Sequence, residues 1–217
     1  MRRYKLELYN EINEALERGN NICIIHPYRT GSTSLGLNIS KFFNIPYFDE
    51  INHDTHPGQF GPNVVLNRPF DIKILYRQPC VYKISIGNIH LVPNNILNTS
   101  SFNIVLKRRN FNLQVASFLM AQQDDKFHSF ETGKLDDDGF DYDISREKLE
   151  IMINKVKDWN EKCTEIKYDR QCYYEDLVSN HVLEPLEKVK KLEKDPAVIR
   201  KIICALKKLE SESIDKH

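Results

Sequence analysis

The stretch 21–35, NICIIHPYRTGSTSL, decides the fold class. Its first five residues are almost all apolar and rich in β-branched side chains, which is typical of a buried parallel strand. The residues HPYRTGSTS that follow favour a turn. Helical spacing begins after them, with apolar side chains at Leu35, Ile39, Phe42 and Phe43. The stretch therefore predicts a strand, a tight loop and a helix in immediate succession.

The rest of the chain repeats this alternation. Apolar runs predict strands at Ile72–Tyr76, Cys80–Ile86, Phe102–Leu106 and Glu165–Tyr174. Three- and four-residue apolar spacing predicts helices over the first 18 residues, from Asn110 through Leu119, and over 149–159, 177–192 and 198–209. Proline and acidic residues predict irregular segments at 46–69 and 135–143. We expect an α/β fold, a three-layer parallel sheet flanked by helices.

Composition limits the classes of protein that the chain can represent. Its 217 residues suit a single domain, over 1–217. Lys plus Arg and Asp plus Glu both number 31, so no global field favours nucleic acid or an anionic membrane as a partner. No apolar run approaches the roughly 20 residues that span a bilayer, and the first residues are too polar for a secretory signal. We expect a cytoplasmic protein whose five scattered cysteines are reduced.

The loop RTGSTS is a candidate anion site. Where a strand ends and a helix starts, backbone N–H groups converge at the positive end of the helix dipole, which suits phosphate or sulfate. Gly31 permits close backbone approach, the hydroxyls of Ser32–Ser34 add donors, and Arg29 adds a fixed charge. The nucleotide-triphosphate loop G-x-x-x-x-G-K-[ST] is not matched, because its first glycine and its lysine are missing. The alternative is a polar turn with a good helix cap.

A second basic segment follows the run Phe102–Leu106. It reads KRRN, and Asn110 is suited to cap the next helix. Ser117 stands eight residues after Arg109, close to two helical turns farther along. Arg109 and Ser117 could therefore grip one phosphate between them. The alternative is a basic strand end that faces water.

Together, the two segments resemble the superfamily of sulfotransferases that use 3′-phosphoadenosine-5′-phosphosulfate (PAPS). HPYRTGSTSL is similar to the 5′-phosphosulfate loop of that superfamily, and VLKRRNFNLQVASFLMAQQ to its 3′-phosphate segment, closest to the bacterial trehalose-sulfotransferase-like branch. CYYEDLV, residues 172–178, resembles a late Y-E-D-L motif. Tyr28 stands where the family usually has proline, Asn110 where aspartate is common, and no late R-K-G loop is found. The resemblance implies a P-loop nucleotide-hydrolase-like sulfotransferase fold.

The resemblance also assigns the donor site. It implies that Arg29 neutralises the leaving oxygen, while the 5′-phosphate is held by Thr30, Gly31, Ser32, Thr33 and Ser34. Arg109 and Ser117 hold the 3′-phosphate. The donor is PAPS, the product is 3′-phosphoadenosine 5′-phosphate (PAP), and no metal is implied.

Three further residues are candidates for catalysis. Glu50 lies in the region where trehalose-type relatives carry a catalytic glutamate, and the alternative is a surface carboxylate. His90 follows the run VYKISI, after which some relatives place a histidine, and the alternative is a structural histidine. Lys83 resembles a lysine that many members direct at the sulfate, and the alternative is a solvated lysine.

These observations predict a sulfotransferase that moves a sulfuryl group from PAPS to a hydroxyl of a sugar or another small molecule. Two alternatives stay open. A nucleotide or small-molecule kinase uses the same strand–loop–helix unit. A non-catalytic nucleotide-binding module would keep the anion loops without a general base. The sequence identifies neither the acceptor nor the oligomeric state.

Overall fold

The computed structural model describes residues 2–49, 51, 72–77, 79–92, 101–123, 144–183 and 196–214. Its contacts divide the chain into two compact units. The first comprises Met1–Arg109 and Trp159–Pro185, and the second comprises Asn110–Asp158 and Leu186–His217. A single domain over 1–217 remains a prediction.

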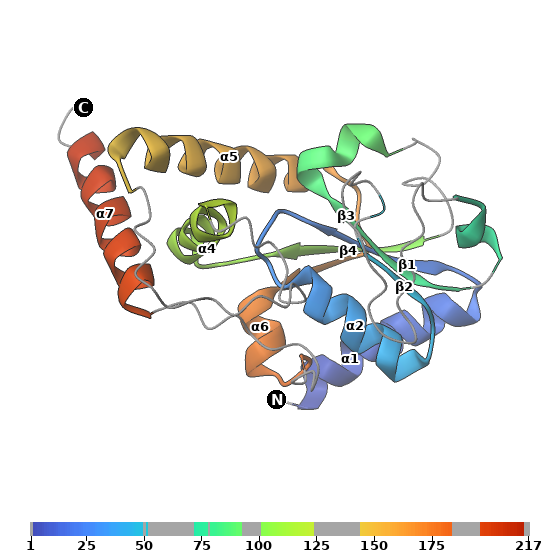
Figure 1. The fold of residues 1–217 in the computed structure, drawn as a ribbon. Helices are drawn as coiled ribbons and strands as arrows, with labels where there is room; N and C mark the ends of the chain where they lie inside the picture. Colours follow the sequence, from blue (N-terminus) through green and yellow to red (C-terminus); the bar gives the residue numbers. More distant parts are fainter. Residues whose placement is uncertain are drawn as a thin grey trace. The chain divides into compact units, whose positions relative to one another are not determined.

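The first unit contains a five-stranded, all-parallel sheet (Figure 1). Its strand order is β2-β3-β1-β4-β5. The central strand β1 is buried along its whole length, which explains its apolar composition. The expected α/β class, with a parallel sheet and flanking helices, is confirmed. The strands are β1 (Asn21–His26), β2 (Tyr47–Phe48), β3 (Val81–Ser85), β4 (Ser101–Lys107) and β5 (Arg170–Tyr173).

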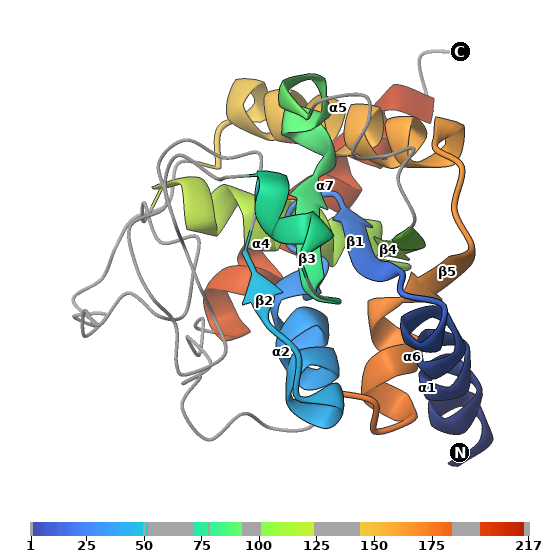
Figure 2. The same ribbon diagram turned by 90° about the vertical axis from the view of Figure 1, so that its right-hand side faces the viewer.

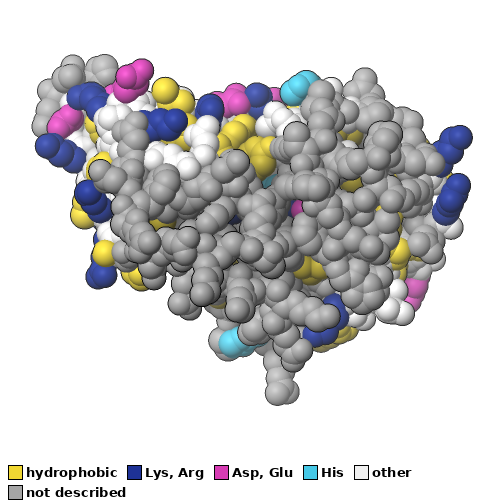
Figure 3. Space-filling model, in the orientation of Figure 1, with side chains coloured by type: hydrophobic (Ala, Val, Ile, Leu, Met, Phe, Trp, Pro, Cys, Tyr) yellow, Lys and Arg dark blue, Asp and Glu magenta, His cyan; other side chains and the backbone are white. Residues whose placement is uncertain are grey.

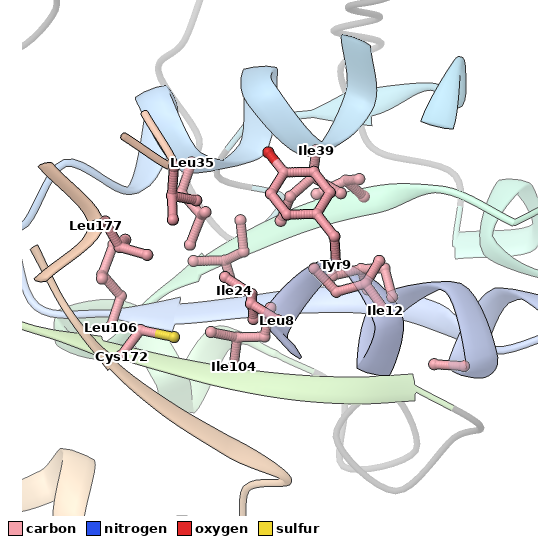
Figure 4. Close-up of a cluster of buried hydrophobic side chains, with 14 of the residues drawn as sticks. Leu8, Tyr9, Ile12, Ile24, Leu35, Ile39, Ile104, Leu106, Cys172 and Leu177 are labelled. Carbon is pink, nitrogen blue, oxygen red and sulfur yellow. The ribbon is translucent and has the colours of Figure 1, made fainter. Parts of the chain in front are cut away.

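Three helices of the first unit lie on one face of this sheet (Figure 2). They are α1 (Arg2–Glu17), α2 (Ser32–Phe43) and α6 (Tyr174–Ser179). Their apolar side chains meet alternate residues of the strands in one buried cluster, which includes Leu8, Ile24, Leu35, Leu106 and Leu177 (Figure 4). Each such side chain contributes roughly 1.5–3 kcal/mol when fully buried. This cluster fixes α2, and with it the loop that precedes α2, against the sheet.

The second unit consists of helices in the part that is described. They are α4 (Phe111–Gln123), most of α5 (Arg146–Glu165), whose last residues from Trp159 belong to the first unit, and α7 (Pro196–Ile214). Helices α4 and α7 contact each other. Arg146 on α5 pairs with Glu212 on α7 at 3.1 Å. The three helices predicted at these places are confirmed.

Other sequence predictions need correction. Ile72–Tyr76 is not a strand but a 3-10 helix, η1, whose Leu75 carbonyl accepts a hydrogen bond from the Asn21 side chain. A short apolar run does not distinguish a strand from a helical turn. The strand predicted at 165–174 is confined to β5, because α5 continues to Glu165 and α6 begins at Tyr174. The helix predicted at 177–192 is α6, which ends at Ser179; residues 184–192 lie outside the described ranges. The two-residue strand β2 was not predicted.

Charged side chains of both signs are visible at the edges of the face in Figure 3. This mixture agrees with the formal net charge of zero. Within the described residues, no helix has the length and apolar character that a membrane crossing requires.

Candidate anion site at the carboxyl end of the sheet

The strand order creates a switch point beside β1. The chain goes from β1 to β2 and β3 on one side, and later to β4 and β5 on the other. In open α/β sheets, ligands bind outside the carboxyl ends of the strands at such a point. The loop 27–31 starts there, directly after β1, and leads into α2. The topology therefore places RTGSTS where a ligand is expected.

Alternating backbone conformations shape this loop. Arg29 and Gly31 have positive φ values of 66° and 80°, and the intervening Thr30 does not. Such alternation turns successive N–H groups toward one concave side, as in anion-binding nests. Thr30 is fully buried, and its hydroxyl donates to the Pro27 carbonyl at 3.0 Å. The left-handed conformation costs a non-glycine residue roughly 1–2 kcal/mol, so the loop holds Arg29 under strain.

Gly31 is required here for two separate reasons. It is the N-cap of α2 in the left-handed region, and its carbonyl accepts a hydrogen bond from Leu35 at 3.1 Å. A Cβ at this position would lie 2.4 and 2.5 Å from two ring carbons of Tyr174. Tyr174 is the first residue of α6. The Y-E-D segment after β5 therefore packs directly against the loop.

A buried polar network reaches the loop from β2 and β3. The Lys83 ammonium donates to the Thr33 hydroxyl at 2.7 Å, in the first turn of α2, and pairs with the Asp49 carboxylate at 2.7 Å. The side chains of Lys83 and Asp49 are 1% and 0% exposed. The Tyr47 hydroxyl donates to the same Asp49 oxygen, Oδ1. Lys83 is thus neither solvated nor distant from the loop, and its charge is compensated by a carboxylate.

Arg108 approaches the loop from β4. Its guanidinium donates to the Arg29 carbonyl at 3.2 Å, lies 5.1 Å from the centre of the Tyr174 ring, and is 3.6 Å from the Glu175 carboxylate. The side chain is only 14% exposed. Burial lowers the pKa of Arg108, because desolvation disfavours the charged form, although Tyr174 and Glu175 act in the opposite direction. This arginine therefore braces the strained residue of the loop.

Arg109 points to a different set of partners. It is 55% exposed, pairs with Asp176 at 2.6 Å and lies 3.9 Å from the centre of the Tyr173 ring. Its backbone N–H donates to Glu175 at 3.0 Å. The hydrogen bond to Asp176 raises the pKa of Arg109. The segment 173–176 thus contacts both arginines at the end of β4.

The structure brings together one part of the predicted site. Arg29, the residues Thr30–Ser34 and Lys83 belong to one arrangement around the loop. His90 is exposed on the 3-10 helix η2 (Ile86–Leu91), and Ser117 is partly buried on α4 in the second unit. Glu50 lies outside the described residues. Within those residues, no group of three or more His, Cys, Asp or Glu side chains is arranged to hold a metal ion.

Two residues of this site were missed from the sequence. Asp49 comes directly after β2, at the same sheet edge as the loop, but it could be found only if Tyr47–Phe48 was recognised as a strand. Arg108 had a usable signal. Arg108 is the first residue after β4, and continuing the strand alternation by one residue places it on the face of Leu106, which lies in the cluster with α2.

Tyr28, which replaces the usual proline of the resembling loops, has packing partners of its own. Its ring lies edge-on to Trp159, with centroids 5.0 Å apart, and its hydroxyl accepts a hydrogen bond from Asn88 at 3.3 Å. A Cβ on Gly87 would come within 3.1 Å of both aromatic side chains. Tyr28 therefore fastens the start of the loop to η2 and to the end of α5.

No family model matches this chain, and neither does any curated protein.

Proposed function

We propose that the protein is a sulfotransferase that transfers the sulfuryl group of PAPS to a hydroxyl of a sugar or another small molecule. One observation carries the proposal: a buried cation that contacts the first turn of α2 comes from a neighbouring strand. Lys83 of β3 donates to Thr33, whereas the loop itself has Ser32 where the G-K-[ST] motif has lysine. This arrangement departs from a nucleotide-triphosphate loop. It agrees with the resemblance, which directs a lysine of this strand at the sulfate.

The described groups suit the charge of such a donor. Sulfuryl transfer depends on in-line positioning and on stabilisation of the negative charge that grows on the departing nucleotide. The N–H groups and hydroxyls at the start of α2 bind the 5′-phosphosulfate in this proposal. Arg29 supplies positive charge, Lys83 donates to the Thr33 hydroxyl, and Arg108 holds the loop in shape through the Arg29 carbonyl. The strand order and the position of the loop support the P-loop-like sulfotransferase fold, which is part of the proposal.

The remaining roles rest on the sequence. We propose Arg109 and Ser117 as ligands of the 3′-phosphate, and Glu50 or His90 as the base that takes the proton of the acceptor hydroxyl. Binding of the 3′-phosphate by Arg109 would have to compete with its ion pair to Asp176. This competition makes the 3′-phosphate the most informative part of the donor to test.

Calorimetry with PAP, AMP and ATP tests the proposal. We expect PAP to bind at least about tenfold more tightly than AMP, an additional 1.4 kcal/mol from the 3′-phosphate. Equal binding of PAP and AMP would contradict a PAPS site. Preference for ATP would favour the kinase alternative, which shares the strand–loop–helix unit.

Transfer of label from PAPS to a mixed set of sugars and phenols then tests catalysis. We expect labelled product, and its formation should fall sharply in Arg29→Ala while PAP still binds. Tight binding of PAP without any transfer would instead favour a non-catalytic module.

A further inference from the structure

A buried chain of contacts connects β2 to the anion loop. It runs from Tyr47 to Asp49, from Asp49 to the Lys83 ammonium at 2.7 Å, and from Lys83 to the Thr33 hydroxyl at 2.7 Å. Tyr47, the first residue in this series of contacts, is fixed by packing against α2, because a Cβ on Gly36 would lie 2.3 Å from the Tyr47 ring. These contacts join the second strand of the sheet to the first turn of α2.

Asp49 and Lys83 form a buried ion pair. An ammonium withdrawn from water tends to lose its proton unless an anion compensates it. Lys83 is 1% exposed, and the Asp49 carboxylate lies 2.7 Å from its ammonium. The Asp49 carboxylate therefore compensates the charge of Lys83 at a position that is withdrawn from water. The second oxygen of Asp49, Oδ2, is buried and makes no hydrogen bond to any described residue.

Thr33 is the last residue in this series of contacts. A hydroxyl has two acceptor lone pairs and one donor hydrogen. Because the Lys83 ammonium donates to the Thr33 oxygen, the hydroxyl hydrogen is directed to another acceptor. Donation from a cation also polarises the hydroxyl and strengthens it as a donor. Thr33 lies in the first turn of α2, directly after the loop, where a bound anion would supply that acceptor.

We infer that Asp49 is a positioning residue of the anion site: it keeps Lys83 charged and directed at Thr33, which in turn donates to the bound anion. This relay, Asp49–Lys83–Thr33, rests on the anion loop of the proposed function, although not on the identity of the nucleotide. Asp49 itself does not touch the anion.

Binding of inorganic sulfate, measured by calorimetry, tests the relay without a nucleotide. We expect Asp49→Asn, Lys83→Met and Thr33→Val each to weaken sulfate binding by about tenfold or more, since each removes a link of a charge-assisted chain. Thr33→Ser should recover most of the affinity that Thr33→Val loses. Glu11→Gln is the matched control, because it breaks a 2.9 Å ion pair to Arg170, at the amino end of β5, and should leave sulfate affinity unchanged.

The double variant Asp49→Asn/Lys83→Met separates positioning from general damage to the fold. If Asp49 acts through Lys83, Asp49→Asn should not weaken sulfate binding any further in a protein that already carries Lys83→Met. Additive losses would overturn the relay, and so would wild-type affinity in Asp49→Asn or no sulfate binding by the wild type. Should Asp49→Asn fail to fold, equal affinities of Thr33→Val and Thr33→Ser would overturn it instead.

The nucleotide experiments keep the two proposals distinguishable. If the sulfate results are as expected but PAP binds no better than AMP, the relay stands and the sulfotransferase proposal falls. If PAP is preferred but Asp49→Asn binds sulfate like the wild type, the relay alone is wrong.

Discussion

Single residues set the geometry of the anion loop. Arg29 and Gly31 both occupy the left-handed region, but only glycine does so without steric cost. Gly31 is further limited by the Tyr174 ring, which fills the space where a side chain would begin. Arg29 is held by the hydrogen bond from Arg108 to its carbonyl. The conformation of the loop therefore depends on partners from β4 and α6 as well as on its own sequence.

Gly31→Ala should destabilise the protein and abolish PAP binding. The added methyl group would collide with Tyr174, and overpacking of this kind typically costs about 1–3 kcal/mol in addition to the backbone strain. Gly19→Ala is the matched control: Gly19 has φ of 78°, but nothing lies within 4 Å of a Cβ there. We expect it to cost only the strain, roughly 1–2 kcal/mol, and to bind PAP normally.

Urea unfolding and calorimetry on both variants provide the measurement. Equal losses of stability in Gly31→Ala and Gly19→Ala would show that the contact with Tyr174 is unimportant. Normal PAP binding by Gly31→Ala would remove the loop from the proposed site.

At the scale of elements, local patterns predicted β1, α2, β3 and β4 because each is long enough to show an apolar run or helical spacing. The two residues of β2 carry no such pattern, and their pairing with β3 depends on contacts distant in sequence. Asp49 was missed for that reason. Arg109 was favoured over Arg108 by its spacing to Ser117, and spacing says nothing of the tertiary partners Glu175 and Asp176. The loop and Lys83 could be named from the sequence, whereas the contacts that Asp49 and Arg108 make with them depend on the tertiary structure.

The two arginines at the end of β4 should respond differently to replacement by lysine. Arg108→Lys loses the planar contact with Tyr174 and the hydrogen bond to the Arg29 carbonyl, so we expect a loss of about 1–3 kcal/mol. Arg109→Lys keeps an exposed charge near Asp176 and should leave the unfolding midpoint nearly unchanged while weakening PAP more than AMP.

Unfolding of each variant in urea, with PAP and AMP titrations, separates the two roles. A stability loss in Arg109→Lys as large as that in Arg108→Lys would contradict the difference in burial. If Arg109→Lys keeps the wild-type selectivity for PAP over AMP, residues other than Arg109 bind the 3′-phosphate.

At the scale of the whole molecule, the burial of each cysteine thiol determines how readily a reagent can reach it. All five cysteines are free, and four of them, Cys23, Cys80, Cys163 and Cys172, are buried. Burial raises the pKa of Cys80 and of Cys163 to about 12, and it also raises the pKa of Cys23 and Cys172. Buried, protonated thiols are poor nucleophiles.

One thiol of the native protein should therefore react quickly with a disulfide reagent at pH 8. Cys204 is the exposed cysteine, and Cys204→Ser should remove this fast reaction. Denaturation in urea should release all five thiols. The absorbance of the group that the reagent releases gives the number of reactive thiols in the native and in the denatured protein. Fast reaction of two or more thiols in the native protein would show that the packing around a buried cysteine opens readily.

Binding of PAP should stabilise the folded state of the whole chain. A ligand that binds only the folded state stabilises it by about 2.7 kcal/mol at a hundred times its dissociation constant. For a chain of this length, that corresponds to a rise of roughly 5–10 °C in the unfolding midpoint. We expect PAP to produce this rise and AMP, at the same concentration, to produce much less. Gly31→Ala should show no rise with PAP, because its loop no longer admits the anion. Equal shifts with PAP and AMP would mean that the 3′-phosphate is not recognised, whereas a shift that persists in Gly31→Ala would place the nucleotide away from the loop after β1.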